Sequence, residues 1–422
     1  MYQKHTLPNG VRIITAPLHE TNAVTVLIMF KVGSRYETQS NNGISHFLEH
    51  LFFKGTKRRP STLEISKALD GVGAEYNAFT SKDYTGYYIK LQHQKFELAL
   101  DILSDILFDS LFLPKEIERE RGVIIEEINM YDDNPMANVE EQLERIMYGD
   151  HPLGWSIAGP KKTIHKITRP QILTYRRDHY HADNTIITIA GKIPVHTLGL
   201  VKKYFGGNKF PKKDGVVFQK VQIQQRSLRI KAKYKKTEQY HIALGWPAYH
   251  YTHHDLDALK ILMTILGGNM SSRLFIGIRE RLGLCYFIRG SVSPYEDVGN
   301  IVIQAGVDKR RIREAIAAIL EEVKKIRDKG VTKEELNKAV DFIKGKVILE
   351  LEDSESLASW VVRQEMFHGK ILTPSQKFQE YDRLNREDIL RVANDIFHPE
   401  RINLAYIGPE RNKKIFENLL HF

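Results

Sequence analysis

The sequence predicts an α+β fold with two similar halves, each a mostly antiparallel sheet with helices on one face. Amphipathic helical stretches alternate with strand-like stretches, and their order recurs after 217 residues, about half of the 422-residue chain. With 42% hydrophobic and 27% charged residues, the chain can build a core, which excludes intrinsic disorder.

The first half contains the clearest strand and helix patterns. Strands are expected near 10–16, 23–32 and 84–92. Because they lie close together in the sequence and show apolar or alternating patterns, we expect them to pair antiparallel. Long amphipathic helices are expected at about 95–109, 115–131 and 136–148.

A helix-then-strand segment occurs in both halves at the same spacing. Five residues of the first copy recur 217 positions later in the second, namely Ile172, Leu173, Asp178, His181 and Gly191 as Ile389, Leu390, Asp395, His398 and Gly408. The same shift relates the strand 24–30 to 241–247. This pattern favours duplication of one α+β unit. The alternative is a chance match, since a helix followed by a strand is a common order.

The boundary between the halves is expected in the stretch 206–215, the part of the chain richest in Gly, Pro and Lys. The predicted domains are 1–207, which carries the candidate site, and 226–422, with 208–225 as a linker.

Several classes of protein are disfavoured by composition. The longest apolar run, 24–30, is far shorter than the ~20 residues of a membrane span, and the N-terminus shows no export signal. The single cysteine, Cys285, permits neither an intrachain disulfide nor a four-cysteine metal site. A cytoplasmic protein without a membrane partner is therefore expected. The net charge of +10 raises nucleic-acid binding as an alternative, but the basic residues are spread along the chain beside many acids.

A helix that begins near residue 44 carries the residues that indicate chemistry. Its buried stripe is formed by residues at i, i+3, i+4, i+7 and i+8, namely Ile44, Phe47, Leu48, Leu51 and Phe52. His46 and His50 lie one turn apart on the same side, with Glu49 beside them. Two such imidazoles can share one zinc, and the carboxylate can reach a metal-bound water. The alternative is an exposed helix face that carries two histidines by chance.

A third metal ligand is expected from the helix at 115–131, because catalytic zinc sites use three protein ligands. Glu120 and Glu127 are seven residues apart on one half-buried face, whereas Glu126 points about 100° away from Glu127. We predict Glu127 as the ligand and Glu120 as a group that orients a ligand or its helix. The alternative is a pair of solvated acids on a charged helix.

These residues together resemble the inverted zinc-motif peptidases, the insulinase/pitrilysin family. Within it, the chain is most similar to the short-chain branch that includes mitochondrial processing peptidase, and the resemblance runs along essentially the whole sequence. It implies that His46, His50 and Glu127 are zinc ligands and that Glu49 is the general base. Because the positions 217 residues after 46–50 hold no ligand, one zinc ion per chain is expected.

Two further segments match the family. The stretch 73–80 resembles the edge strand that pairs with the substrate backbone, which would place Asn77, Ala78 and Phe79 beside a bound peptide; an ordinary hairpin strand is the alternative. Arg279 and Tyr286 resemble a pair that closes the active site from the second half and stabilises the oxyanion, with a structural salt bridge as the alternative for Arg279. His250, His253 and His254 are interpreted as part of a surface turn.

The sequence therefore predicts a zinc-dependent endopeptidase in which metal-bound water attacks with Glu49 as general base. By resemblance, the two halves would face each other across a cleft, and the protein would hydrolyse peptides or unfolded segments inside a closed chamber. A homodimer is the simplest assembly, and a heterodimer with a degenerate homologue is the other. The alternatives are a non-catalytic scaffold or partner subunit of the same fold and, from another class, a basic nucleic-acid-binding protein.

Overall fold

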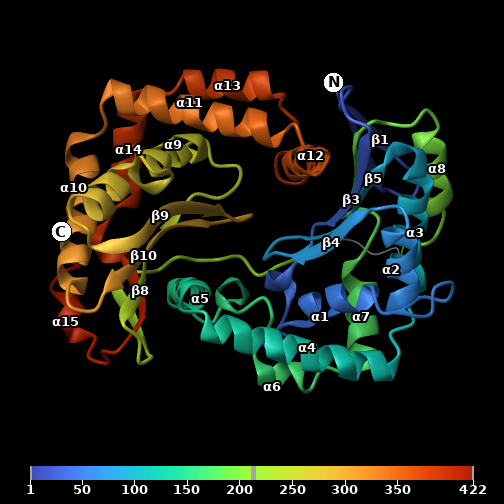
Figure 1. The fold of residues 1–422 in the computed structure, drawn as a ribbon, viewed down its shortest axis with the longest axis horizontal. Helices are drawn as coiled ribbons and strands as arrows, with labels where there is room; N and C mark the ends of the chain where they lie inside the picture. The colour runs from blue at the N-terminus through green and yellow to red at the C-terminus, as the bar shows by residue number, and fades with distance from the viewer. Residues whose placement is uncertain (1, 211–214, 421–422) are drawn as a thin grey trace. The chain divides into compact units, whose positions relative to one another are not determined.

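The computed structural model describes residues 2–210 and 215–420. Residues 211–214 of the predicted linker 208–225, together with residues 1, 421 and 422, lie outside the described residues. The chain forms two compact units, each with its own mixed sheet and helices (Figure 1). The first unit draws on 1–129, 156–219 and 348–373, and the second on 130–155, 220–347 and 374–422.

The sheet of the first unit has the strand order β1-β2-β6-β3-β5-β4. Its strands are β1 (Gln3–Thr6), β2 (Arg12–Pro17), β3 (Ala23–Phe30), β4 (Glu75–Thr80), β5 (Thr85–Gln92) and β6 (Thr185–Gly191). All neighbours pair antiparallel except β2 and β6, which are parallel. The predicted strands and the mostly antiparallel sheet are confirmed, but β6 lies between β2 and β3, so these two do not pair as expected.

Helices cover both faces of this sheet. One face packs on a core that includes residues of α1 (Ile44–Phe52), α3 (Phe96–Asp109), α7 (Arg169–His179) and α8 (Thr197–Phe205). The other face packs on α12 (Ser354–His368). Within β3, Val26 and Ile28 face the first core, while Leu27 and Met29 face α12. This two-sided burial explains why the strand is apolar at nearly every position.

The second unit repeats this arrangement. Its sheet has the order β7-β11-β8-β10-β9, built from β7 (Arg229–Tyr234), β8 (Gln239–Ala248), β9 (Cys285–Pro294), β10 (Gly299–Asp308) and β11 (Asn403–Gly408). Only β7 and β11 are parallel. This is the order of β2-β6-β3-β5-β4, with the parallel pair at the same place, so the predicted internal repeat is confirmed by strand topology.

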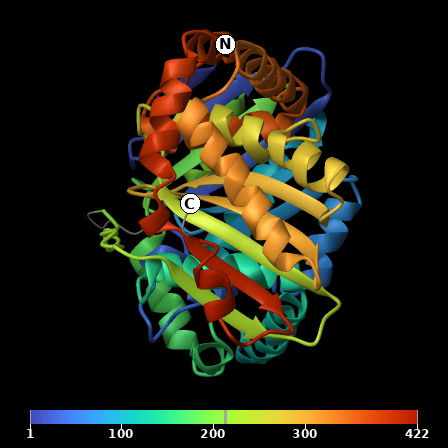
Figure 2. The same cartoon turned by 90° about the vertical axis from the view of Figure 1, so that its left-hand side faces the viewer.

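Helices also cover both faces of the second sheet. The main core includes residues of α9 (Leu256–Gly267), α10 (Ile312–Lys329) and α14 (Arg386–Ile396); α10, in orange, lies in front of the strands in Figure 2. The opposite face packs on α5 (Pro135–Tyr148). The sequence analysis expected helices on one face only, but α5 and α12 each cover the second face of a sheet.

Each of the two extra helices follows a long helix in the chain. α5 follows α4 (Pro114–Asp133), and α12 follows α11 (Lys333–Glu350). At 1.5 Å per residue, the 20 residues of α4 extend about 30 Å. The remaining helices are α2 (Thr62–Asp70), α6 (Lys161–Ile164), α13 (Pro374–Asp382) and α15 (Lys414–Glu417). In the described part of the chain, no helix is long and apolar enough to cross a membrane.

The N-terminus of α1 is held by a buried carboxylate from a preceding turn. Glu37 accepts hydrogen bonds from the backbone N–H groups of Gly43, at 2.7 Å, and Ser45, at 2.8 Å. These are groups that a helix cannot satisfy internally. Gly43 has φ +97°, and a Cβ there would lie 2.6 Å from the carbonyl oxygen of Ala158. The entry to α1 therefore requires both an acceptor at Glu37 and a glycine at position 43.

We predict that Gly43→Ala destabilises the protein by about 1–3 kcal/mol through backbone strain alone, with the steric contact adding to this loss. The measurement is the free energy of unfolding from chemical denaturation. Gly199→Ala is the matched control, because no atom lies within 4 Å of the position of its Cβ. On an exposed stretch of α8 this control should stabilise by up to about 1 kcal/mol. Equal stability of Gly43→Ala and the wild type would contradict the prediction.

Candidate metal centre

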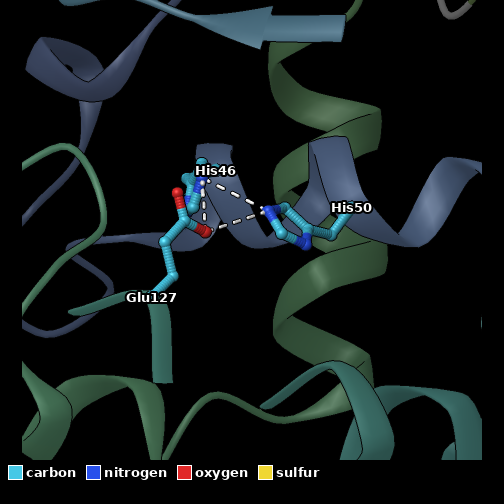
Figure 3. Close-up of side chains that lie close together, drawn as sticks. All are labelled: His46, His50 and Glu127. Carbon is cyan, nitrogen blue, oxygen red and sulfur yellow. Dashed lines mark hydrogen bonds and ion pairs between the residues drawn. The ribbon is translucent and has the colours of Figure 1, made fainter. Parts of the chain in front are cut away.

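Three side chains from two helices converge in the first unit (Figure 3). The Nε2 atoms of His46 and His50 on α1 are 3.3 Å apart. Oε2 of Glu127, on α4, lies 3.6 Å from Nε2 of His46 and 3.5 Å from Nε2 of His50. The structure therefore brings together the three residues predicted from helical spacing.

The three donor atoms fit a divalent cation of zinc type. Ligands bound about 2.0–2.1 Å from one tetrahedral zinc lie about 3.3 Å from one another, close to the observed separations of 3.3, 3.5 and 3.6 Å. Two imidazole nitrogens and one carboxylate oxygen also form a donor set that zinc prefers. A single cation would satisfy all three atoms.

The two helices place these groups through their buried faces. In α1, the predicted apolar stripe is confirmed, since its five members are at most 1% exposed, namely Ile44, Phe47, Leu48, Leu51 and Phe52. In α4, Ile117 and Ile124 are buried in the same core. With both helices anchored from one side, His46 and His50 face the carboxylate of Glu127.

Glu120 lies against the other ring nitrogen of His50. Its Oε2 is 3.2 Å from Nδ1 of His50, and its Oε1 is 2.8 Å from Nζ of Lys54. Burial by itself would raise the pKa of Glu120, but the hydrogen bonds from His50 and Lys54 outweigh burial and lower the pKa. The ionised carboxylate can only accept, so Nδ1 of His50 donates the hydrogen bond. In the neutral imidazole, this leaves the lone pair on Nε2, which points toward His46 and Glu127.

The two histidines differ in proton affinity. Burial and the neighbouring His50 lower the pKa of His46 to about 4, which keeps its imidazole neutral. For His50, burial also disfavours the charge, but the hydrogen bonds to Glu120 and Glu127 outweigh it and raise the pKa to about 9. The pKa of Glu127 is lowered, chiefly by its hydrogen bond to His50. Without a metal ion, the cluster therefore holds a proton on His50.

Glu49 lies on α1 between the two histidines and contacts the sheet. Oγ1 of Thr80, the last residue of β4, donates a 2.6 Å hydrogen bond to Oε2 of Glu49. Burial raises the pKa of Glu49, while the hydrogen bond from Thr80 opposes this rise. A carboxylate with a raised pKa is a stronger base than an ordinary one, which suits it to accept a proton.

The predicted substrate-binding residues lie on β4. This strand pairs with β5 and is the last strand in the order of the sheet, and it contacts α1. Asn77 is exposed, whereas Ala78 and Phe79 are half-buried. The open edge of β4 thus lies in the sheet next to the helix that carries His46 and His50.

Arg279 and Tyr286 lie together in the second unit. Arg279 belongs to a π-helical turn (η4, Phe275–Arg281), and Tyr286 follows Cys285 at the start of β9. The guanidinium carbon of Arg279 is 4.6 Å from the ring centroid of Phe275 and 5.7 Å from that of Tyr286. Nε of Arg279 lies 3.9 Å from Oε1 of Glu280. The tyrosine is 77% exposed, so the pair is available on the surface of its unit.

A second group of potential ligands occurs at His253, His254 and Asp255. Both carboxylate oxygens of Asp255 accept hydrogen bonds from the guanidinium of Arg391, which already supplies a cation. Nδ1 of His253 accepts a hydrogen bond from the backbone N–H of Asp255. These contacts support the interpretation of this segment as a turn that leads into α9.

The sequence analysis missed three residues that support the site, namely Glu37, Lys54 and Thr80. Lys54 could have been found, because it lies four residues after His50, where a side chain of the same helical face is expected. Glu37 and Thr80 reach α1 through a turn and through a strand. No local pattern in the sequence identifies such contacts.

Comparisons with known proteins agree with this geometry. A family model described as insulinase (peptidase family M16) matches residues 12–161, and one described as the peptidase M16 inactive domain matches residues 166–342. The zinc protease YmxG of Bacillus subtilis is 35% identical over 412 residues, which cover 98% of this chain and 99% of the relative. A zinc protease of Streptomyces coelicolor is 33% identical over 417 residues, covering 98% of this chain and 90% of that protein.

Among solved structures, the crystal structure of a protease from Helicobacter pylori is similar to the whole chain. The TM-score is 0.91 at 25% sequence identity, and the match covers 97% of this chain and 99% of that one. The narrower resemblance to mitochondrial processing peptidase stays a prediction.

The charge state of His50 predicts how zinc binding depends on pH. Since the pKa of His50 is raised to about 9 and zinc binds the neutral imidazole, zinc must displace a proton at pH 7. We expect about one proton released per zinc at pH 7, and an affinity that rises with pH up to about 9. Calorimetry in buffers of different ionisation enthalpy measures the release. Glu120→Gln should reduce it, and no release by the wild type at pH 7 would contradict the prediction.

Proposed function

This chain belongs to the insulinase family of peptidases (M16), and we propose that it is a zinc-dependent endopeptidase. The observation that carries the proposal is the convergence of His46, His50 and Glu127, with donor atoms 3.3–3.6 Å apart. The full-length relatives named zinc proteases support it.

In this proposal, His46, His50 and Glu127 hold one zinc ion per chain. When bound, zinc supplies Lewis-acid chemistry that activates water and polarises the scissile carbonyl. Glu120 holds His50 in the tautomer that presents Nε2, and Lys54 in turn holds Glu120. Met263 and Lys344 lie 217 residues after His46 and Glu127. Neither side chain is suited to bind zinc, which supports a single site.

Glu49 is the general base. Because Oε2 accepts the hydrogen bond from Thr80, Oε1 is the atom left to take the proton from the attacking water. Oε1 then returns the proton to the leaving amine. Thr80 fixes the rotamer of the carboxylate while leaving this second oxygen free for proton transfer.

The substrate is proposed to bind as an extended peptide along the open edge of β4. Backbone N–H and C=O groups at a sheet edge pair with any extended chain, so this mode tolerates many sequences. Asn77, Ala78 and Phe79 would line the bound segment. This binding mode would select peptides or unfolded segments as substrates, because a folded protein rarely presents a strand that is free to pair.

Arg279 and Tyr286 are proposed to complete the site from the second half of the chain, across a cleft between the halves. A guanidinium and a phenol are both donors that can stabilise the oxyanion of a tetrahedral intermediate. Tyr286 is exposed, and Arg279 pairs only weakly with Glu280. Both side chains are therefore free to donate hydrogen bonds to a substrate. A homodimer that encloses a chamber in the cytoplasm is the assembly we propose.

A non-catalytic scaffold of the same fold is the alternative, but every predicted ligand and the general base are present and clustered. Such a scaffold has no need for two imidazoles that share a carboxylate, backed by Glu120. The peptidase is therefore the better proposal.

Two variants distinguish the proposed role of Glu49 as general base from that of Glu127 as metal ligand. We expect Glu49→Gln to keep zinc but to lower peptide hydrolysis by about 10²–10⁴-fold, the usual contribution of a general base. Glu127→Ala should lose zinc as well as activity. Zinc analysis and the cleavage of a peptide library, with and without chelator, provide the two readouts.

Glu126→Ala is the matched control, since Glu126 is the exposed neighbour of Glu127 on α4 and should keep both zinc and activity. Normal peptide turnover by Glu49→Gln would contradict the role of Glu49 as general base. Full zinc content in Glu127→Ala would contradict the role of Glu127 as a metal ligand.

The contribution of the second half is tested at Arg279. Arg279→Ala should lower the rate of peptide cleavage by about 10²–10³-fold, as for loss of an oxyanion donor, while zinc content stays unchanged. The control is Arg281→Ala, an exposed arginine of the same π-helical turn, which should behave as the wild type. If both variants cleave peptides at the wild-type rate, Arg279 has no role in the reaction.

A further inference from the structure

A cavity of about 210 Å³ lies in the first unit and shares no lining residue with the metal centre. Four aromatic rings form much of its wall, from Phe30, Phe108, Tyr180 and Phe210. The centroids of Phe108 and Phe210 are 4.9 Å apart, and those of Phe30 and Tyr180 are 4.4 Å apart. These rings offer an apolar surface that is already packed and ordered.

Leu107 and Leu173 add to the apolar wall, and the three other lining residues are basic. Arg176, Arg177 and Lys209 line the cavity, and none of its described lining residues is acidic. Arg177 and Lys209 are exposed and therefore form the solvent side of the cavity. An apolar wall with several cations and no acid favours an anionic ligand that also carries an apolar group.

Arg176 is the least exposed of these cations. Its Nη2 donates to the backbone carbonyls of Leu107 and Phe108, and its guanidinium lies 5.9 Å from the ring centroid of Phe112. Among residues 2–210 and 215–420, no carboxylate oxygen lies within 4 Å of its guanidinium nitrogens. Burial lowers the pKa of Arg176, with the charge of Asp109 opposing this only in part. A half-buried guanidinium held by neutral carbonyls is stabilised by a nearby anion.

Its two cationic neighbours differ in their partners. Arg177 pairs with the carboxylate of Asp178 at 3.0 Å, so its charge is already balanced. Lys209 donates from Nζ to the backbone oxygen of Tyr204 and lies 5.5 Å from the ring centroid of Phe108. Arg176 and Lys209 are therefore the cations that a ligand could neutralise.

The volume sets the size of that ligand. An apolar cavity of about 150 Å³ accommodates benzene, so 210 Å³ leaves room for one ring and a carboxylate. We propose that this cavity binds a small organic monocarboxylate with a single aromatic or similarly sized apolar group. Its carboxylate would be recognised by Arg176 and Lys209, and its ring by the four aromatic side chains.

The cavity is linked to the core behind the metal helix. The ring of Tyr180 lies 5.8 Å from that of Phe52 in the last turn of α1, and its hydroxyl is 3.2 Å from that of Tyr87. A bound acid would thus contact the same aromatic cluster that anchors α1. Since it binds the folded unit only, it should raise the thermal stability of the protein.

Benzoate and benzyl alcohol are the probes, because they share a ring and a similar size but differ in charge. Calorimetric titration of the full-length, zinc-loaded protein measures both affinities. Benzoate should bind at least about tenfold more tightly than benzyl alcohol, the factor expected for a hydrogen bond to a charged group. Equal affinities, or no binding of benzoate, would overturn the proposal.

Three variants locate the binding. Arg176→Gln should lower the affinity for benzoate at least about tenfold and leave the affinity for benzyl alcohol nearly unchanged. Arg169→Gln is the matched control, because Arg169 also donates to two backbone carbonyls, those of Phe112 and Leu111, yet does not line the cavity; it should bind benzoate as the wild type does. Leu173→Trp, which fills the cavity, should abolish the binding of both probes.

Circular dichroism and the unfolding midpoint show whether each variant is folded. Benzoate binding that survives both Arg176→Gln and Leu173→Trp would place the ligand elsewhere and refute the inference. Because these experiments measure binding and not peptide cleavage, their outcome is independent of the proposed peptidase activity.

Discussion

The meeting of three lone-pair donors from α1 and α4 is the constraint on which the rest of the site depends. Nε2 of His46, Nε2 of His50 and Oε2 of Glu127 lie within 3.6 Å of one another, an arrangement that needs a proton or a metal ion between its members. Because neither helix can move without separating the donors, their apolar faces must be held by the core. The five fully buried residues of α1 and the isoleucines of α4 supply that anchor.

A second layer of contacts decides which atoms the site presents. Glu120 fixes the tautomer of His50, and Lys54 holds Glu120. Thr80 donates a hydrogen bond to Oε2 of Glu49 and so orients its carboxylate. Glu37 satisfies the backbone donors at the start of α1. Each of these residues acts by orienting a polar group that would otherwise have several orientations.

The internal repeat accounts for both the symmetry and the asymmetry of the chain. The two sheets share one strand order with a single parallel pair, yet only the first half retains metal-binding side chains at the corresponding positions. Lys344 lies where the shift of 217 residues would place a partner of Glu127, and it pairs with Asp382. In the proposed function, the first half would hold the metal ion and the second half would contribute Arg279 and Tyr286, a separation of roles that such a duplication permits.

Much of this protein was determined by local sequence. The stripe of α1 and the spacing of His46, Glu49 and His50 depend only on helical periodicity, and β3 and β5 depend on short apolar or alternating runs. The choice of Glu127 over Glu126 follows from the same geometry, since a helix turns by about 100° per residue.

Tertiary structure decided what no local pattern encodes. β6 inserts between β2 and β3, and α5 and α12 cover second faces of the sheets, because sheet pairing and helix packing bury apolar surface between segments distant in the chain. Likewise, the contacts of Thr80 with Glu49 and of Glu37 with Gly43 bridge separate elements. Arg176 and the aromatic rings around it line one cavity only after β3, α3, α7 and the segment that follows α8 have packed together. Periodicity shows which face of a segment is apolar, but only the folded chain determines which partner covers that face.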